Sequence, residues 1–370
     1  MTPNILSRLN IFIEENRSFA IYRTPGSDNA HFIAQEQGAL QQLPSIESLN
    51  GQSGFVIAPF EISGHSPLVL IRPDREECIQ LPAVDPIGFQ GSNGHIHPPV
   101  KIDQAYADRF YTCLSTLKEQ RFRKLVLSRE KSIERETNFS PAEAFLLACS
   151  RYVRSYVYLF HTPATGTWLG CTPEILLAGE KERWQTVALA GTQALRQGTL
   201  PDVWNNKNLM EQMLVTYYIR KQLAAFGVQP QEKGPYTVIA GELAHLKTDF
   251  HFDLGDTGQL GDLLNLLHPT PAVSGLPKAA ARRFILANEG YDRLYYSGFV
   301  GSLNPQGKSD LYVNLRCMNI LEHSLKLYAG GGLLPTSNLA DEWQETEDKM
   351  QTMLFVAKNR LIQTPQYVFK

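Results

Sequence analysis

The sequence predicts an α+β fold in which antiparallel sheets are flanked by helices. Strand-like runs follow one another across short turns and helical segments come in blocks, which favours antiparallel sheets over a doubly wound parallel sheet. Neither GxGxxG nor GxxxxGK(S/T) occurs, so a nucleotide cofactor has no support. A chain of 370 residues with 43% hydrophobic residues admits one large domain or two ordinary ones.

The first hundred residues are the least regular part of the chain. Short strand-like runs, such as 18–22 and 53–58, alternate with Pro/Gly turns, and Pro98-Pro99 closes the region. We expect a β-rich first lobe here.

Helices and strands become clearer after residue 100. Tyr106, Phe110, Cys113, Leu114 and Leu117 form the apolar face of a helix, and a strand follows at 124–129. Ser140, Pro141 and Glu143 have the order of an N-cap, a first-turn proline and a capping-box glutamate. The remaining expected elements are strands at 156–161, 168–177 (broken by a proline) and 184–190, a helix at 205–226 ended by Gly227, and helix–strand alternation over 259–331.

Charge and hydropathy exclude two classes of partner. A formal net charge of −2 leaves no general basic field for nucleic acid, and no apolar run approaches the roughly 20 residues that span a bilayer. The first seven residues lack the features of a signal peptide, and the 5 cysteines are scattered without a CxxC pair. We therefore expect a cytoplasmic protein with reduced thiols.

Two adjoining segments near the C-terminus suggest a site for a cation and an anion. A strand is expected to dissolve into Gly330-Gly331-Gly332, where a ligand can approach the backbone amides. On the helix that follows, Glu342, Glu345 and Lys349 are spaced i, i+3, i+7 and so share one stripe. We expect carboxylates, amides and a lysine in this arrangement to bind a hard cation that carries an anionic substrate.

Lys124 and Glu174 are candidates for a base and an acid. Lys124 opens a hydrophobic strand; a surface lysine is the common case there, whereas a buried one would have a lowered pKa and could act as a general base. Glu174 lies between a proline and an apolar strand; it is either a solvated turn residue or a buried general acid with a raised pKa.

Glu211 and Arg316 are the other charged candidates. Met210, Met213, Leu214 and Tyr217 indicate that much of the Glu211 helix is buried, so Glu211 needs either a metal shared with Glu345 or a lysine partner. Arg316, expected within a core strand at 311–318, has the character of a carboxylate-binding arginine. His245 and His268 are weaker candidates, and no pair of histidines has zinc spacing.

Set together, these segments resemble the chorismate-utilising enzymes: isochorismate synthases, salicylate synthases, and the large subunits of anthranilate and aminodeoxychorismate synthases. The similarity covers about residues 100–360. It is carried by KLVLSR (124–129), GCTPEIL (170–176), LAGT (189–192), HPTPAVSGLP (268–277), YDRLYYSGFVG (291–301), Arg316, 329–335 and 342–349.

The resemblance implies a single domain over 1–370, with a variable β-rich part at 1–100 and a catalytic core at 101–365. It implies two large antiparallel sheets packed face to face with helices outside. It also implies Mg²⁺ held by Glu211 and Glu345, with Glu342 in support, and chorismate bound through both carboxylates. The substrate-binding residues it implies are Thr192, His245, Ala272, Tyr296, Arg316, Gly330, Gly331, Gly332 and Lys349.

Lys124 bears on which reaction to expect. Family members that add ammonia resemble one another in having glutamine at this position, whereas those that add water have lysine. The resemblance therefore implies that Lys124 activates water to attack C2 and that Glu174 protonates the leaving C4 hydroxyl. The product would be isochorismate, for menaquinone or siderophore biosynthesis, made by a monomer that needs no glutaminase subunit.

Two other activities remain open. Ala190 stands where aminodeoxychorismate synthases have a lysine that forms a covalent intermediate, which argues against covalent chemistry. A salicylate synthase is the enzymatic alternative, although 268–275 is similar to the isochorismate synthase version of that loop. The non-enzymatic alternative is a catalytically silent relative that only binds chorismate. Such a protein would have no need to keep Lys124, Glu174, Glu211, Arg316 and Glu345 together.

Three positions depart from the family pattern. Gln212 replaces a common histidine, Asn208 a common acidic residue, and Cys171 a small alanine or serine. We expect the first two to lower magnesium affinity and all three to tune activity without abolishing it.

Overall fold

The computed structural model describes residues 5–82, 101–195, 199–200 and 203–359. The expected Pro98-Pro99 boundary and the end of the core at 365 lie outside these residues.

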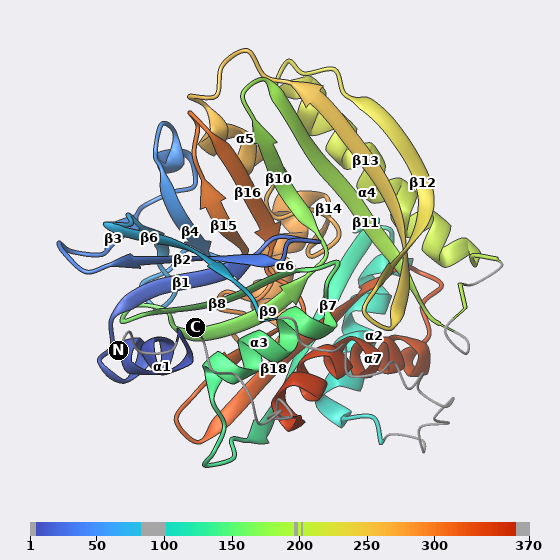
Figure 1. The fold of residues 1–370 in the computed structure, drawn as a ribbon. Helices are drawn as coiled ribbons and strands as arrows, with labels where there is room; N and C mark the ends of the chain where they lie inside the picture. Colours follow the sequence, from blue (N-terminus) through green and yellow to red (C-terminus); the bar gives the residue numbers. More distant parts are fainter. Residues whose placement is uncertain (1–4, 83–100, 196–198, 201–202, 360–370) are drawn as a thin grey trace.

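Within the described residues, the strands form two antiparallel sheets of nine strands each (Figure 1). The first sheet has the order β14 (Gly275–Leu276), β7 (Lys124–Glu134), β18 (Ser324–Leu333), β17 (Cys317–Ile320), β9 (Gly166–Thr172), β8 (Tyr156–Thr162), β1 (Ser18–Arg23), β2 (Asn29–Gln35) and β6 (Arg75–Gln80). The second has the order β12 (Gln231–Ala240), β13 (Leu243–Asp253), β11 (Arg183–Ala194), β10 (Ile175–Glu180), β16 (Lys308–Val313), β15 (Phe299–Leu303), β4 (Gly54–Ala58), β5 (Leu68–Ile71) and β3 (Gln41–Leu43).

Helices cover the outer faces of both sheets. They are α1 (Ile5–Glu14), the 3₁₀ turn η1 (Glu47–Leu49), α2 (Gln104–Lys118), α3 (Pro141–Arg151), α4 (Asn206–Ala225), α5 (Leu260–Leu267), α6 (Lys278–Asn288) and α7 (Leu339–Lys358). Helices α1, α3 and α7 pack on the first sheet, α4 and α5 on the second, and α2 and α6 against β7.

A layer of aromatic side chains joins the two sheets. The rings of Tyr156 on β8 and Tyr312 on β16 stack with centroids 4.3 Å apart, and Tyr158, Trp168 and Phe55 are buried in the same cluster. Such stacked pairs add to the burial of apolar area that holds one sheet on the other. The predicted two-sheet α+β fold is confirmed.

The first hundred residues are β-rich, as predicted, but their strands do not form a lobe of their own. Strands β1, β2 and β6 extend the first sheet, while β3, β4 and β5 extend the second. The N-terminal part therefore supplies the last three strands in the order given above for each sheet.

The predicted helix boundaries are also confirmed. The Ser140 side chain accepts a hydrogen bond from the Glu143 backbone N–H, and Asn205 caps α4 in the same way through Asn208. Gly227, with φ +86°, follows α4 in the left-handed conformation that glycine adopts without strain.

Two of the points at which the chain passes from one sheet to the other lie next to each other. After β9 it crosses through Pro173-Glu174 into β10, and after β16 it crosses back through 314–316 into β17. The crossings are hydrogen-bonded together: the Thr172 hydroxyl donates to the Val313 carbonyl (2.6 Å), and the Cys171 N–H to the Arg316 carbonyl (3.0 Å).

Arg316 is therefore not inside a strand, and that expectation was wrong. The strand at 311–318 is split between two sheets, and Arg316 has φ +47°, a left-handed conformation rare for a residue with a side chain. The run of apolar residues continues across the break because both flanking strands are buried.

A buried ion pair ties the start of β7 to the segment after α6. Glu289 Oε1 accepts hydrogen bonds from the backbone N–H and the hydroxyl of Ser128, both at 2.7 Å. Arg293 donates two hydrogen bonds to Glu289 and a third to the Val273 carbonyl (2.7 Å). Each buried charge is thus matched, as a low-dielectric interior requires.

We expect Glu289→Gln to lower the free energy of unfolding by about 3–5 kcal/mol, because it leaves the Arg293 guanidinium buried without a counter-charge. Urea unfolding followed by circular dichroism measures this. The control is Glu232→Gln, which breaks the exposed pair with Arg220 and should cost about 0–1 kcal/mol. Equal effects of the two substitutions would contradict a stabilising role for the buried pair.

Candidate functional site

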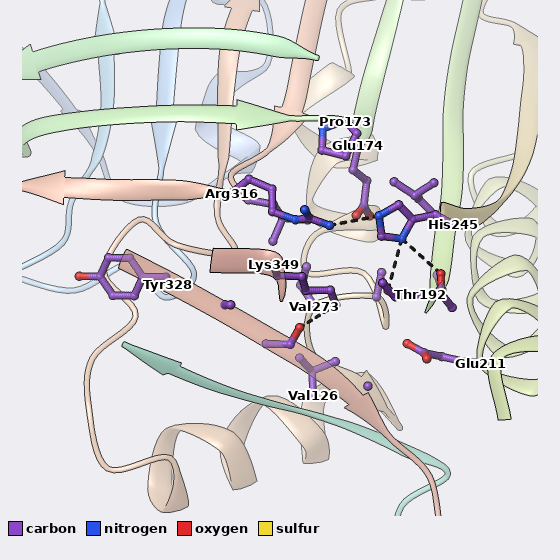
Figure 2. Close-up of a pocket in the computed structure, with 18 of the residues that line it drawn as sticks. Val126, Pro173, Glu174, Thr192, Glu211, His245, Val273, Arg316, Tyr328 and Lys349 are labelled. Carbon is purple, nitrogen blue, oxygen red and sulfur yellow. Dashed lines mark hydrogen bonds between the residues drawn. The ribbon is translucent and has the colours of Figure 1, made fainter. Parts of the chain in front are cut away.

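A cavity lies beside the two crossings, between the ends of both sheets and helices α4 and α7 (Figure 2). It is lined by residues of both sheets, of the crossings and of the two helices: Val126, Pro173, Glu174, Leu189, Ala190, Gly191, Thr192, Glu211, His245, Ala272, Val273, Tyr296, Leu315, Arg316, Tyr328, Ala329, Gly330, Gly332 and Lys349. All the predicted substrate-binding residues except Gly331 are in this lining.

Arg316 points into the cavity and is held by His245 (Figure 2). Its Nη2 donates to His245 Nε2 at 3.1 Å, and His245 Nδ1 lies 3.2 Å from the Gly191 carbonyl. Because a guanidinium can only donate, Nε2 must be the acceptor and the proton must sit on Nδ1. Burial, and then the Arg316 charge, push the pKa of His245 well below its usual value, so the ring is neutral. A neutral His245 is what allows Arg316 to face an anion.

Glu174 is a buried carboxyl group at the first crossing. Its side chain lines the cavity, the residue is 2% exposed, and its Oε1 has no hydrogen-bond partner among the described residues. Burial raises the pKa of Glu174 to about 8, even though the ammonium groups of Lys124 and Lys349 oppose the shift. Glu174 therefore holds a proton near neutral pH, and the solvated-turn interpretation is wrong.

Lys124 is fully buried at the first position of β7, so the surface-lysine interpretation is also wrong. Its Nζ lies 2.9 Å from Glu211 Oε1. Burial lowers the pKa of Lys124, and the Glu211 carboxylate works against that shift. Lys124 thus contacts Glu211, which is part of the cavity lining.

Glu211 faces inward, but the expected reason was wrong. Met210, Met213 and Tyr217 are about half exposed, at 47%, 54% and 53%, so the apolar neighbours on which the expectation rested lie on the outward side of α4. The buried side carries polar groups, including Asn208, Glu211 and Gln212. Glu211 has the lysine partner that the sequence left as an alternative.

Three lysines lie against three glutamates at this end of the cavity. Lys124 lies 2.9 Å from Glu211, Lys207 2.9 Å from Glu342, and Lys349 2.6 Å from Glu345. Burial favours the neutral form of Glu211 and Glu345, but the neighbouring lysines outweigh it and leave both pKa values below normal. The pKa of Glu342 is raised to about 7, mainly by burial.

Sequence reasoning missed Lys207 as a site residue. It stands four positions before Glu211 on α4, a helical spacing that could have paired the two. Its contacts with Glu342 and Glu345 could not be found in this way, because α7 lies more than 130 positions further along the chain.

The glycine run makes room for these side chains. The strand was expected to end in the glycine run, but β18 continues through it to Leu333. A Cβ on Gly332 would collide with the carboxylate of Glu211, and one on Gly331, on the opposite face, would press on Glu342. The Lys349 ammonium donates to the Gly330 carbonyl at 2.8 Å. Backbone without side chains is therefore needed for the lysine–glutamate cluster to approach β18.

The residues that depart from the family pattern are bound to the sheets or buried in them. Gln212 donates to the Ala188 carbonyl and the Thr248 hydroxyl, and Asn208 donates to the Thr192 carbonyl. Both bind α4 to the second sheet. Cys171 is buried in the first sheet's outer core. Their effect on magnesium affinity and activity stays a prediction.

The chain matches the family model described as "Chorismate binding enzyme" over residues 92–357, and it belongs to this family. It is similar to the isochorismate synthase EntC of Escherichia coli K12, with 33% identity over 209 residues that make up 54% of each chain. It is also similar to the isochorismate synthase DhbC of Bacillus subtilis, with 28% identity over 84% of this chain and 85% of that one. The match to EntC thus spans about half of that relative's length.

Solved structures share the fold. The menaquinone-specific isochorismate synthase MenF from Escherichia coli has a TM-score of 0.77 at 21% identity, covering 97% of this chain and 92% of the other. Anthranilate synthase component I from Streptococcus pneumoniae has a TM-score of 0.67 at 17% identity, over 91% and 90%. Among the described residues, no helix is long and apolar enough to cross a membrane.

Glu174 should make stability depend on pH. Its pKa of about 8 in the folded protein lies above the ordinary 4.5, so its stabilising contribution is full below pH 4.5 and is lost as the pH rises to about 8. Glu174→Gln cannot ionise and should lose less stability than wild type over this window, as urea unfolding at several pH values will measure. Glu180→Gln, at the exposed end of β10, should follow wild type. Parallel profiles for wild type and Glu174→Gln would show that Glu174 titrates normally.

Proposed function

We propose that this protein converts chorismate to isochorismate in a magnesium-dependent reaction. The observation that carries the proposal is a pair of buried groups with opposite pKa shifts: burial lowers the pKa of Lys124 and raises that of Glu174 to about 8. The two shifts move the amine toward the form that accepts a proton and the carboxyl group toward the form that donates one. The isochorismate synthases among its relatives point to the same reaction.

Lys124 is the proposed base. Its neutral amine takes a proton from water as the water oxygen bonds to C2 of the ring. The ring double bonds shift, and the C4–oxygen bond breaks. Glu174 gives its proton to the departing hydroxyl, which leaves as water. One water enters and one leaves, so the reaction is an isomerisation and needs no oxidant.

Arg316 and Lys349 are the proposed anchors of the substrate's carboxylates. Arg316 is held toward the cavity by a neutral histidine, so its remaining donors can form two parallel hydrogen bonds with a carboxylate. Tyr296, stacked on Tyr328 with ring centroids 5.4 Å apart, adds a hydroxyl beside Gly330.

Glu211 and Glu345 would hold Mg²⁺, with Glu342 beside them. The donor set fits, because Mg²⁺ prefers carboxylate oxygens and is commonly bound by one or two of them together with substrate and water. Among the described residues, no group of three or more His, Cys, Asp or Glu side chains is placed to hold a metal ion by itself, so substrate and water would have to complete the coordination. Glu342 Oε2 is also buried and has no hydrogen-bond partner within the part of the chain that the structure describes. When bound, Mg²⁺ would supply positive charge against the ring carboxylate.

The decisive assay incubates the purified protein with chorismate and Mg²⁺ and resolves the products by chromatography. We expect isochorismate without release of pyruvate. Salicylate together with pyruvate would establish the salicylate synthase alternative, and unchanged chorismate would establish a silent binding protein.

Lys124→Ala should reduce isochorismate formation by about 100- to 10,000-fold, the usual loss when a general base is removed. Chorismate binding, measured by calorimetry, should persist. Lys131→Ala on the same strand, whose ammonium pairs with Glu347, is the control and should retain turnover. Near-normal turnover of Lys124→Ala would remove Lys124 from the mechanism.

Chelator-treated protein should be inactive and should recover on addition of Mg²⁺. Glu345→Gln should raise the Mg²⁺ concentration needed for half-maximal rate, because it removes one carboxylate from a hard-cation site. Glu322→Gln, on an exposed turn, should leave it unchanged. Full activity in chelator would refute the magnesium assignment.

A further inference from the structure

The Lys207 ammonium sits among the same carboxylates that the proposed function gives to Mg²⁺. It lies 2.9 Å from Glu342 Oε1, 3.6 Å from Glu211 Oε2 and 3.9 Å from Glu345 Oε2. Its side chain is 17% exposed, and it is the one lysine in the described part of the chain within 4 Å of all three glutamates. Glu211 belongs to α4, whereas Glu342 and Glu345 belong to α7, so Lys207 bridges the two helices.

We propose that Lys207 occupies the position of the divalent cation in the metal-free protein, and that the cation binds by displacing it. The inference rests on the proposed magnesium site and adds a residue to it. Without a cation, Lys207 keeps three neighbouring carboxylates from repelling one another. When a dication takes those oxygens as ligands, the ammonium and the metal become like charges competing for the same acceptors.

The structure has space for the displaced side chain. A second cavity of about 530 Å³ lies on the outer side of the cluster, against about 60 Å³ for the inner one. Lys207 itself lines the outer cavity, together with Glu342, Glu345 and Asp341. Asp341 is exposed at the start of α7 and offers a carboxylate to an ammonium that has turned outward.

The three lysines of this cluster, Lys124, Lys207 and Lys349, differ in how freely their side chains can move. Lys124 is fully buried, and Lys349 is fixed by both Glu345 and the Gly330 carbonyl. Lys207, in contrast, borders the outer cavity. Of the three lysines, it is therefore the one that can leave the carboxylates without opening the site.

The first test compares Mg²⁺ binding to wild type and Lys207→Met by calorimetry, without chorismate. Methionine keeps the length of the side chain and removes the charge. We expect the variant to bind Mg²⁺ at least about tenfold more tightly, because the competing charge is gone. Lys247→Met is the control: it also removes one positive charge, but from a pair with Asp249, and should match wild type. Equal or weaker binding by Lys207→Met would overturn the proposal.

The second test uses the wild-type protein and so does not depend on the variant folding. An amine-acetylating reagent is applied with and without Mg²⁺, and modification is read by mass spectrometry. Mg²⁺ should speed labelling of Lys207 several-fold and leave Lys131 unchanged. Labelling of Lys207 that does not respond to bound Mg²⁺ would refute displacement.

Failure of this inference can be told from failure of the proposed function. If wild type binds Mg²⁺ and needs it to form isochorismate, yet neither test changes as expected, only the displacement by Lys207 is wrong. If neither wild type nor Lys207→Met binds Mg²⁺ and the reaction proceeds in chelator, the magnesium site itself is wrong, and the inference about Lys207 is wrong with it.

Discussion

The site depends on two neighbouring points, after β9 and after β16, at which the chain crosses from one sheet to the other. Sheets that pack face to face leave few places for a polar group to reach the interior, because the space between them is filled by side chains such as Tyr156 and Tyr312. Each crossing interrupts a strand and turns its backbone, and the two crossings place Glu174 and Arg316 at the cavity. Hydrogen bonds between the crossings fix one relative to the other. The left-handed backbone at Arg316 is tolerated because the strands on both sides are locked into different sheets.

Charge balance is the second constraint. Burial alone would drive every ionisable group here toward its neutral form. The outcome differs among them because their partners differ: Glu211 and Glu345 each have two lysines near them, whereas Glu174 has no hydrogen-bond partner at Oε1 among the described residues and keeps its proton. The same desolvation therefore produces ionised carboxylates at one end of the cavity and an acid at the other.

The features set by local sequence could be predicted, and those set by long-range packing could not. Caps at Ser140 and Asn205 and the end of α4 at Gly227 follow from short-range hydrogen bonds and backbone preferences. Periodicity failed at Arg316, because two buried strands of different sheets join in one apolar run. It failed again on α4, where polar residues face inward, since the partners that make their burial favourable lie on β7 and α7. The resemblance identified the family and most of the cavity lining, but it did not include Lys207.

The charge of the free site bears on why a cation should be needed at all. With Lys124 as the neutral amine of the proposed mechanism, Lys207, Lys349 and Arg316 carry three positive charges, and Glu211, Glu342 and Glu345 carry three negative ones when ionised, so the site has no net charge with Glu174 protonated. Chorismate brings two carboxylates, so the substrate alone would turn this enclosed site to −2. A dication entering with the substrate would restore a net charge of zero. Because an unmatched charge in a low-dielectric site is costly, the proposed metal and substrate should favour each other's binding. If Lys207 turns outward, the carboxylates that paired with its ammonium become available to the metal.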